Sequence, residues 1–177
     1  EERFRFINTR LEYLYERVNN LNEGGSSWSK INGTTINISS LNHKHPIKQI
    51  FIYNAASLDQ SYNKLKYNIF VNGQGIFSES FNHEFFSKVE IVNKFKGCIY
   101  GTSLDASKNT ILDNNIALID FSLKNTEGPS GCISPSNNTI KLHIDNNNNS
   151  YEFNIKIYTV CYYLLSISNG ELRYVFD

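Results

Sequence analysis

Hydrophobic positions in the first part of the chain repeat at spacings of three and four residues. They fall at Phe4, Ile7, Leu11, Leu14, Val18 and Leu21. This spacing is typical of the seam of a coiled coil, with alternate members at the a and d positions of a heptad. No Gly or Pro interrupts the segment, and Gly24-Gly25 follow it as a helix stop. The pattern predicts a coiled-coil stalk over residues 1–24, in which these six residues trimerise the chain.

A helix this short is marginal in water, so it needs neighbours. The alternative to self-association is an amphipathic helix that packs on its own β-domain. Arg3, Arg10 and Arg17 would occupy position g, and no acidic residue occupies position e. Salt bridges between these positions therefore cannot hold a parallel bundle together.

After residue 26 the hydrophobic pattern changes from helical spacing to alternation, as in Ile140, Leu142 and Ile144. Strands are predicted at residues 35–41, 48–53, 65–71, 75–81, 86–92, 96–100, 116–123, 139–144, 151–167 and 171–176. Asn72-Gly73 and Asn169-Gly170 are strong hairpin signals. Residues 35–177 are therefore predicted to form an antiparallel, jelly-roll-like β-sandwich head, with residues 25–34 as the junction.

The composition indicates a folded protein without a dominant charge. Hydrophobic residues make up 40% of the chain, and 17 basic residues balance 17 acidic ones. This balance argues against nucleic acid or an anionic membrane as the main partner. No apolar run reaches the roughly 18–20 residues of a membrane span. The chain contains no Met, so we expect it to be a processed chain or a fragment that joins an upstream virion or fibre component.

The search for chemistry finds no nucleophile elbow, no zinc-protease motif and no phosphate-binding loop. His43 and His45 lack a third ligand nearby, and His83-Glu84 lies in an aromatic segment that we expect to turn. The oxygen-rich segment 105–115 lacks the spacing of an EF-hand. Cys98, Cys132 and Cys161 are an odd number and are expected to be buried free thiols, with one disulfide as the alternative. We therefore expect no catalytic residues, no metal and no cofactor.

A glycan site would combine aromatic rings with amide and carboxylate side chains, because sugars present both C–H faces and hydroxyl groups. Candidates of this kind are Tyr53, Asp59, Tyr62, Asp105 and Asn109. Several of them fall in predicted loops, which often carry binding residues.

The layout resembles the C-terminal region of trimeric phage tail-fibre and receptor-binding proteins. The resemblance is carried by the heptads Phe4–Leu21, by the Gly-Gly-Ser-Ser-Trp sequence at 24–28, and by 35–53, where Ile36, Ile38 and Leu41 precede Ile47-Lys48-Gln49-Ile50-Phe51-Ile52-Tyr53. It implies a homotrimer that attaches to a glycan or protein on a host cell surface, located in a virion tail fibre or outside the cell. It supplies no fixed set of binding residues.

Two other functions stay open at this point. The abundance of Asn also fits a secreted or surface adhesion domain of an Asn-rich protozoan. A polysaccharide-degrading enzyme on a trimeric β-scaffold would need paired carboxylates in a groove, which a sequence cannot show. A non-enzymatic attachment module is the function that the sequence favours.

Overall fold

The computed structural model describes eight segments of the chain. These are residues 10–21, 34–37, 45–54, 65–91, 116–123, 129–146, 155–169 and 171–175. The strands are β1 (Leu11–Asn20), β2 (Thr34–Asn37), β3 (Ile47–Asn54), β4 (Leu65–Val71), β5 (Gln74–Gly75), β6 (Phe81–Asn82), β7 (Ile116–Asp120), β8 (Ile140–Asn146), β9 (Ile155–Ser168) and β10 (Glu171–Tyr174). Among the described residues between β6 and β7, the helical segment is η2 (Phe85–Glu90).

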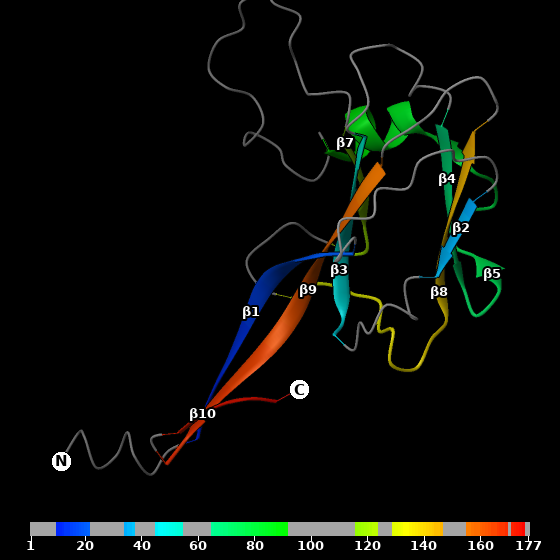
Figure 1. Cartoon of the computed structure of the whole chain (residues 1–177). Coiled ribbons are helices and arrows are strands. Elements are labelled where there is room, and N and C mark those ends of the chain that lie inside the picture. Colours follow the sequence, from blue (N-terminus) through cyan, green and yellow to red (C-terminus); the bar gives the residue numbers. More distant parts are fainter. Residues whose placement is uncertain are drawn as a thin grey trace, which may run out of the picture.

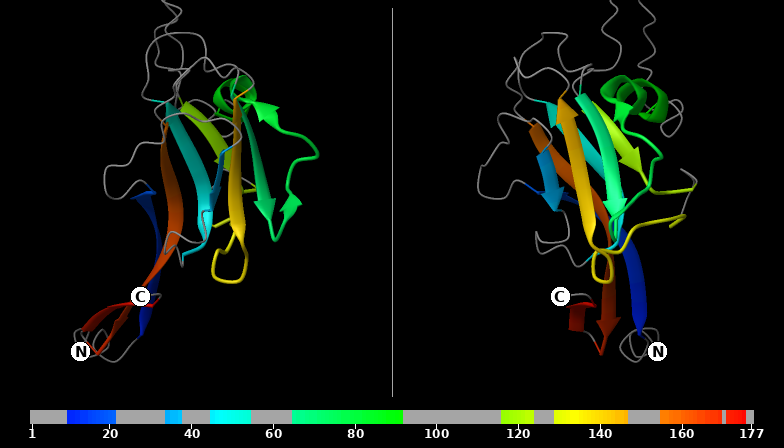
Figure 2. Two further views of the ribbon diagram at one scale, coloured as in Figure 1. Left: turned by 45° about the vertical axis from the view of Figure 1, so that its right-hand side comes forward. Right: turned by 90° about the vertical axis from the view of Figure 1, so that its right-hand side faces the viewer.

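The strands form two antiparallel sheets that face each other (Figures 1 and 2). The first sheet has the order β1-β9-β3-β7, with β10 beside β9. The second sheet has the order β2-β8-β4-β5, with β6 beside β4. From β1 to β4 and from β7 to β9 the chain changes sheet at every connection, which is the pattern of a jelly roll. The prediction of an antiparallel β-sandwich is confirmed.

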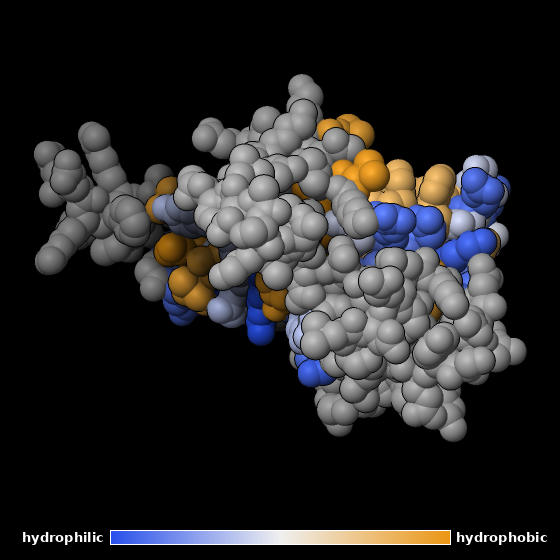
Figure 3. All heavy atoms as spheres, turned by 90° about the horizontal axis from the view of Figure 1, so that it is seen from above, coloured by the Kyte–Doolittle hydropathy of each residue, from blue (hydrophilic) through white to orange (hydrophobic). Residues whose placement is uncertain are grey.

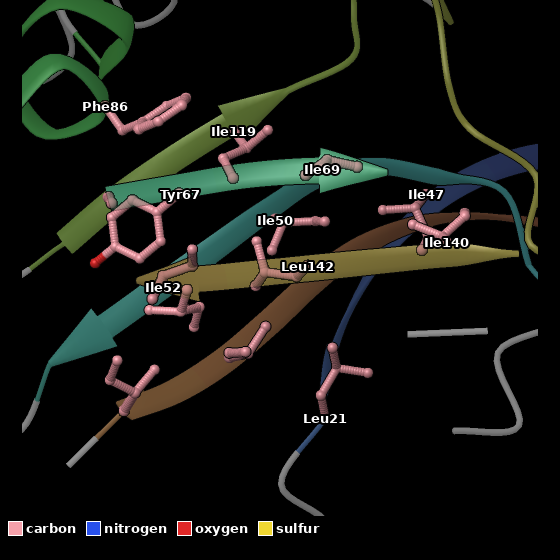
Figure 4. Close-up of a cluster of buried hydrophobic side chains, with 14 of the residues drawn as sticks. Leu21, Ile47, Ile50, Ile52, Tyr67, Ile69, Phe86, Ile119, Ile140 and Leu142 are labelled. Carbon is pink, nitrogen blue, oxygen red and sulfur yellow. The ribbon is translucent and has the colours of Figure 1, made fainter. Parts of the chain in front are cut away.

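The core lies between the two sheets because alternate side chains of each strand point inward. In the first sheet Ile50 lies opposite Ile119 and Thr159, and Ile52 lies opposite Ala117 and Ile157. The second sheet contributes the buried residues Leu65, Tyr67, Ile69, Ile140, Leu142 and Ile144 (Figure 4). This layer of aliphatic and aromatic side chains holds the sheets together.

A bulge at Lys48 shifts the register of β3 against β9 between Ile47 and Gln49. As a result Ile47 and Ile50, three residues apart, are both fully buried. A regular strand would have turned one of them to the outer face.

The predicted stalk is wrong where the structure describes it. Residues 11–20 form a strand that pairs with β9 at all ten positions, from Leu11 opposite Ile167 to Asn20 opposite Tyr158. A heptad places Leu11, Leu14, Val18 and Leu21 on one side of a helix, whereas a strand divides them between two faces. Leu21 is buried in the core, while Val18 is 63% exposed.

The remaining two seam residues, Phe4 and Ile7, lie outside the described residues. So do 25–33 of the predicted junction, the predicted strand at 96–100 and Cys98.

The strand predicted at 86–92 is also wrong, because residues 83–91 are helical. Asn82 Oδ1 accepts a hydrogen bond from the backbone N–H of Phe85 at 3.0 Å, which ties down the first turn. Phe86 is buried and meets Phe77 and Phe81 edge-on. The aromatic spacing suits either period, and packing against the core selects the helix. No described helix is long and apolar enough to cross a membrane.

Both predicted hairpins are confirmed. Asn72 and Gly73 have φ of 52° and 83° between β4 and β5, and Asn169 has φ of 53° between β9 and β10. Positive φ at these positions is what a tight turn between antiparallel strands requires.

Two substitutions by alanine distinguish the observed strand from the predicted helical seam. Leu21→Ala is expected to lower the free energy of unfolding by about 3 kcal/mol, because it leaves a cavity in the core. Val18→Ala is expected to cost only about 0.5 kcal/mol, because Val18 is exposed. Urea denaturation measures both values. Equal losses at the two positions would instead favour a shared hydrophobic seam.

Candidate functional site

Three strands extend beyond the sandwich as a ribbon (Figures 1 and 2). The ribbon consists of residues 11–14 of β1, 164–168 of β9, and β10. It exists because β9 is longer than its partner β3, which pairs with β9 only as far as Cys161. Beyond that point β9 pairs with β1 on one side and β10 on the other.

One face of the ribbon is apolar. Directly opposite residues of antiparallel strands point to the same face, so the pairings define two rows across the ribbon. The rows are Leu11–Ile167–Leu172 and Tyr13–Leu165–Tyr174. Tyr13, Leu172 and Tyr174 are 50%, 57% and 51% exposed. Seen from above, hydrophobic side chains are visible between the grey residues on the side of the molecule toward which the ribbon extends (Figure 3).

The other face of the ribbon is polar toward the tip and carries one apolar pair nearer the body. Glu12, Ser166 and Arg173 form one row, and Ser168 lies opposite Glu171. The apolar pair is Leu14 opposite Leu164, and Leu14 is 46% exposed. Glu171 and Arg173 form an ion pair with 2.6 Å between Oε2 and a guanidinium nitrogen, and Arg10 and Glu12 form a second at the same distance. These four side chains are well exposed, so the pairs keep this face hydrated and add little stability.

An aromatic cluster fixes the root of the ribbon on its inner face. The ring of Tyr163 stacks on His45 with 3.8 Å between centroids, and it contacts Tyr15 at 5.5 Å. The guanidinium of Arg17 lies 5.6 Å from the same ring. The amide of Asn19 donates to Tyr163 Oη at 2.8 Å. Burial raises the pKa of Tyr163, and the bond to Asn19 opposes that shift.

A lysine fixes the root on the outer face. Lys48, at the bulge of β3, donates to Glu16 Oε1 of β1 at 2.6 Å. Its ammonium also lies 5.8 Å from the centre of the Tyr162 ring in β9. The Lys48 side chain is only 12% exposed, so this contact is better shielded than the ion pairs of the ribbon. The ribbon is thus anchored to the body on both faces.

The fold resembles solved virus structures. The capsid protein of the PBCV-1 virus capsid matches with a TM-score of 0.68 and 18% identity, over 99% of this chain and 54% of that one. PBCV-1 VP54, fitted into a reconstruction of the virophage Sputnik, matches with a TM-score of 0.68 and 17% identity over the same shares. The major capsid protein of Faustovirus matches at 0.51 and 12%, over 88% of this chain and 33% of that one.

This chain has the fold of viral capsid proteins. It spans about half the length of the two PBCV-1 chains that it matches. No protein-family model and no curated protein sequence matches it.

The tail-fibre attachment function is therefore wrong, and so is the trimeric helical stalk on which it depended. The structural neighbours are capsid proteins, and the described part of the stalk is a strand of the sandwich. The viral part of the resemblance agrees with these neighbours. The adhesion and polysaccharide-degrading alternatives have no counterpart among them.

Only one residue predicted to bind a glycan can be placed. Tyr53 lies half-buried on the outer face of the first sheet, opposite Ile116 and Lys156. Asp59, Tyr62, Asp105 and Asn109 lie outside the described residues, so the glycan site stays a prediction.

The apolar rows of the ribbon were missed, although their signal is present in the sequence. Leu172 and Tyr174 alternate with Glu171 and Arg173. This alternation gives β10 one apolar and one polar face.

Among the described residues, no group of three His, Cys, Asp or Glu side chains could hold a metal ion. Cys132 and Cys161 are both free thiols, and only Cys161 is buried as expected.

His83 is fully buried rather than incidental to a turn. Its Nδ1 lies 2.8 Å from Tyr67 Oη, and Tyr67 is also fully buried. Burial raises the pKa of Tyr67, so the phenol keeps its proton and can donate it to His83. The pair links β4 to the start of the helical segment inside the core.

The raised pKa of Tyr67 predicts loss of stability in alkali. The folded state holds the phenol proton more tightly than the unfolded chain does. Tyr67 therefore makes its full contribution to the free energy of unfolding below the tyrosine pKa of the unfolded chain, about 10. This contribution falls progressively as the pH rises above that value. Above that pH the free energy of unfolding is expected to fall less steeply for the Tyr67→Phe variant than for the parent chain. The two slopes should differ by up to about 1.4 kcal/mol per pH unit. Denaturation series at rising pH test this expectation, and parallel curves for the variant and the parent chain would contradict it.

Proposed function

We propose that this chain is a structural subunit of a virus shell. One observation carries the proposal: the chain matches the PBCV-1 capsid protein over 99% of its length, with a TM-score of 0.68. A sandwich that faces two sheets around a continuous apolar core suits this role, because a shell protein needs a rigid body that keeps its shape without a ligand.

The proposed role is structural rather than enzymatic and places the protein in the virion. Its main partners would be further copies of the chain, since a shell is built by repetition. The heptad pattern in the sequence predicts a homotrimer. Residues 11–20 form the strand β1 and not a helix, so this pattern no longer supports a trimer. We retain the trimer only as one oligomer that the proposed subunit could form.

Purified particles of the source virus test this function. Mass spectrometry is expected to find the chain among the abundant proteins of the particle, because a shell needs many copies. Gold-labelled polyclonal antibodies raised against the folded chain are expected to bind detergent-opened or fragmented shells all over their walls. Labelling confined to a tail or fibre tip, or absence from the particles, would contradict the proposal.

A further inference from the structure

We propose that the apolar face of the ribbon is a contact surface between copies of this chain. Its occupant is the same face of a second copy. This inference deepens the proposed shell function and depends on it for its biological role. It goes further by naming the surface through which copies meet.

The ribbon has one face that water solvates poorly. Tyr13, Leu172 and Tyr174 come from both outer strands of the ribbon, and each is about half exposed. Leu165 and Ile167 of the central strand lie between them in the same two rows. Apolar side chains that are continuous across three strands form a patch, which marks a binding surface more strongly than scattered residues do.

Charge favours a like partner for this face. The two rows contain no charged side chain, so two copies can approach face to face without repulsion. The full chain adds no long-range repulsion, because its formal net charge is zero. A strongly basic or acidic partner would find no complementary charge in these rows. The charged residues of the ribbon lie on the opposite face, already paired as Arg173 with Glu171 and Arg10 with Glu12.

The described part of the molecule leaves the ribbon accessible to another copy. The second sheet ends above it, so the described sandwich does not cover its inner face (Figure 2). The contacts of Tyr163 with His45 and of Lys48 with Glu16 hold the root in place. Two such ribbons can therefore meet as preformed sheets, packed about 10 Å apart with the two rows interleaved.

The size of the face predicts a weak pairwise contact. Three strands about 4.8 Å apart, over roughly four residues of about 3.4 Å each, give a face of roughly 200 Å². Two such faces bury well below the roughly 1,200 Å² of a standard interface, so we expect a Kd on the order of 100 µM. Repetition in a shell would add up many such contacts, which then need not be strong one by one.

Sedimentation velocity on the 177-residue chain, from about 10 µM to about 1 mM, tests the contact. The weight-average mass is expected to rise from the 20.3 kDa of one chain as the concentration increases. The Leu172→Lys variant puts a charge on the apolar face and is expected to raise the Kd about tenfold or more. Its matched control is Glu171→Lys, one residue away on the polar face, for which a change within about twofold is expected.

A second pair of variants on the other outer strand repeats the comparison, with Tyr13→Lys against Glu12→Lys. All four positions are substantially exposed, so the fold should survive, and unchanged thermal unfolding by circular dichroism verifies this. A mass that stays at one chain over the whole range would overturn the proposal. So would folded apolar-face variants that associate as the parent does, or polar-face variants that weaken association equally.

The contact and the shell function can fail separately. Association of the pure chain without any labelling of particles would keep the contact and remove the shell function. Labelled particle walls together with a pure chain that stays monomeric would keep the shell function and remove the proposed contact.

Discussion

The hydrogen-bonded ladder along β9 is the constraint on which the rest of the structure depends. Its first half, from Ile155 to Cys161, pairs with β3 and supplies inward side chains to the core. β1 pairs with β9 from Tyr158 to Ile167, and β10 pairs with its last four residues, so the second half of β9 is the centre of the ribbon. One strand of 14 residues therefore belongs both to the body and to the part that extends from it. Truncating this strand would remove the centre of the first sheet and the middle of the ribbon together.

The ribbon needs the body, because a few strands with no second layer are marginally stable in water. The stacking of Tyr163 on His45 and the contact of Lys48 with Glu16 supply part of that support from opposite faces. Neither contact covers the apolar rows farther out, where Leu172 and Tyr174 stay about half exposed. An exposed apolar surface of this kind promotes aggregation of a monomeric protein, whereas in an assembly of many copies it is available for burial against a neighbour.

The sequence predicts best those elements whose conformation depends on a few neighbouring residues. The strand at 65–71 and the turn at Asn72-Gly73 depend on a short alternating run and on two residues that tolerate positive φ. The helix predicted over residues 11–20 is wrong because the partner of this segment is far away in the chain. Asn19 bonds to Tyr163, 144 residues further on. A helical spacing of leucines is a local signal, and ten consecutive pairings with β9 outweigh it.

The same change of period decides which side chains lie on the apolar face of the ribbon. A helical seam would join Leu11, Leu14 and Val18, whereas the strand keeps Leu11 on the apolar face and turns the other two to the opposite side. Tyr13 takes their place, and β10 adds Leu172 and Tyr174. The alternation was visible in the sequence, but the exposure was not. It depends on where the second sheet ends, and only the assembled fold determines that.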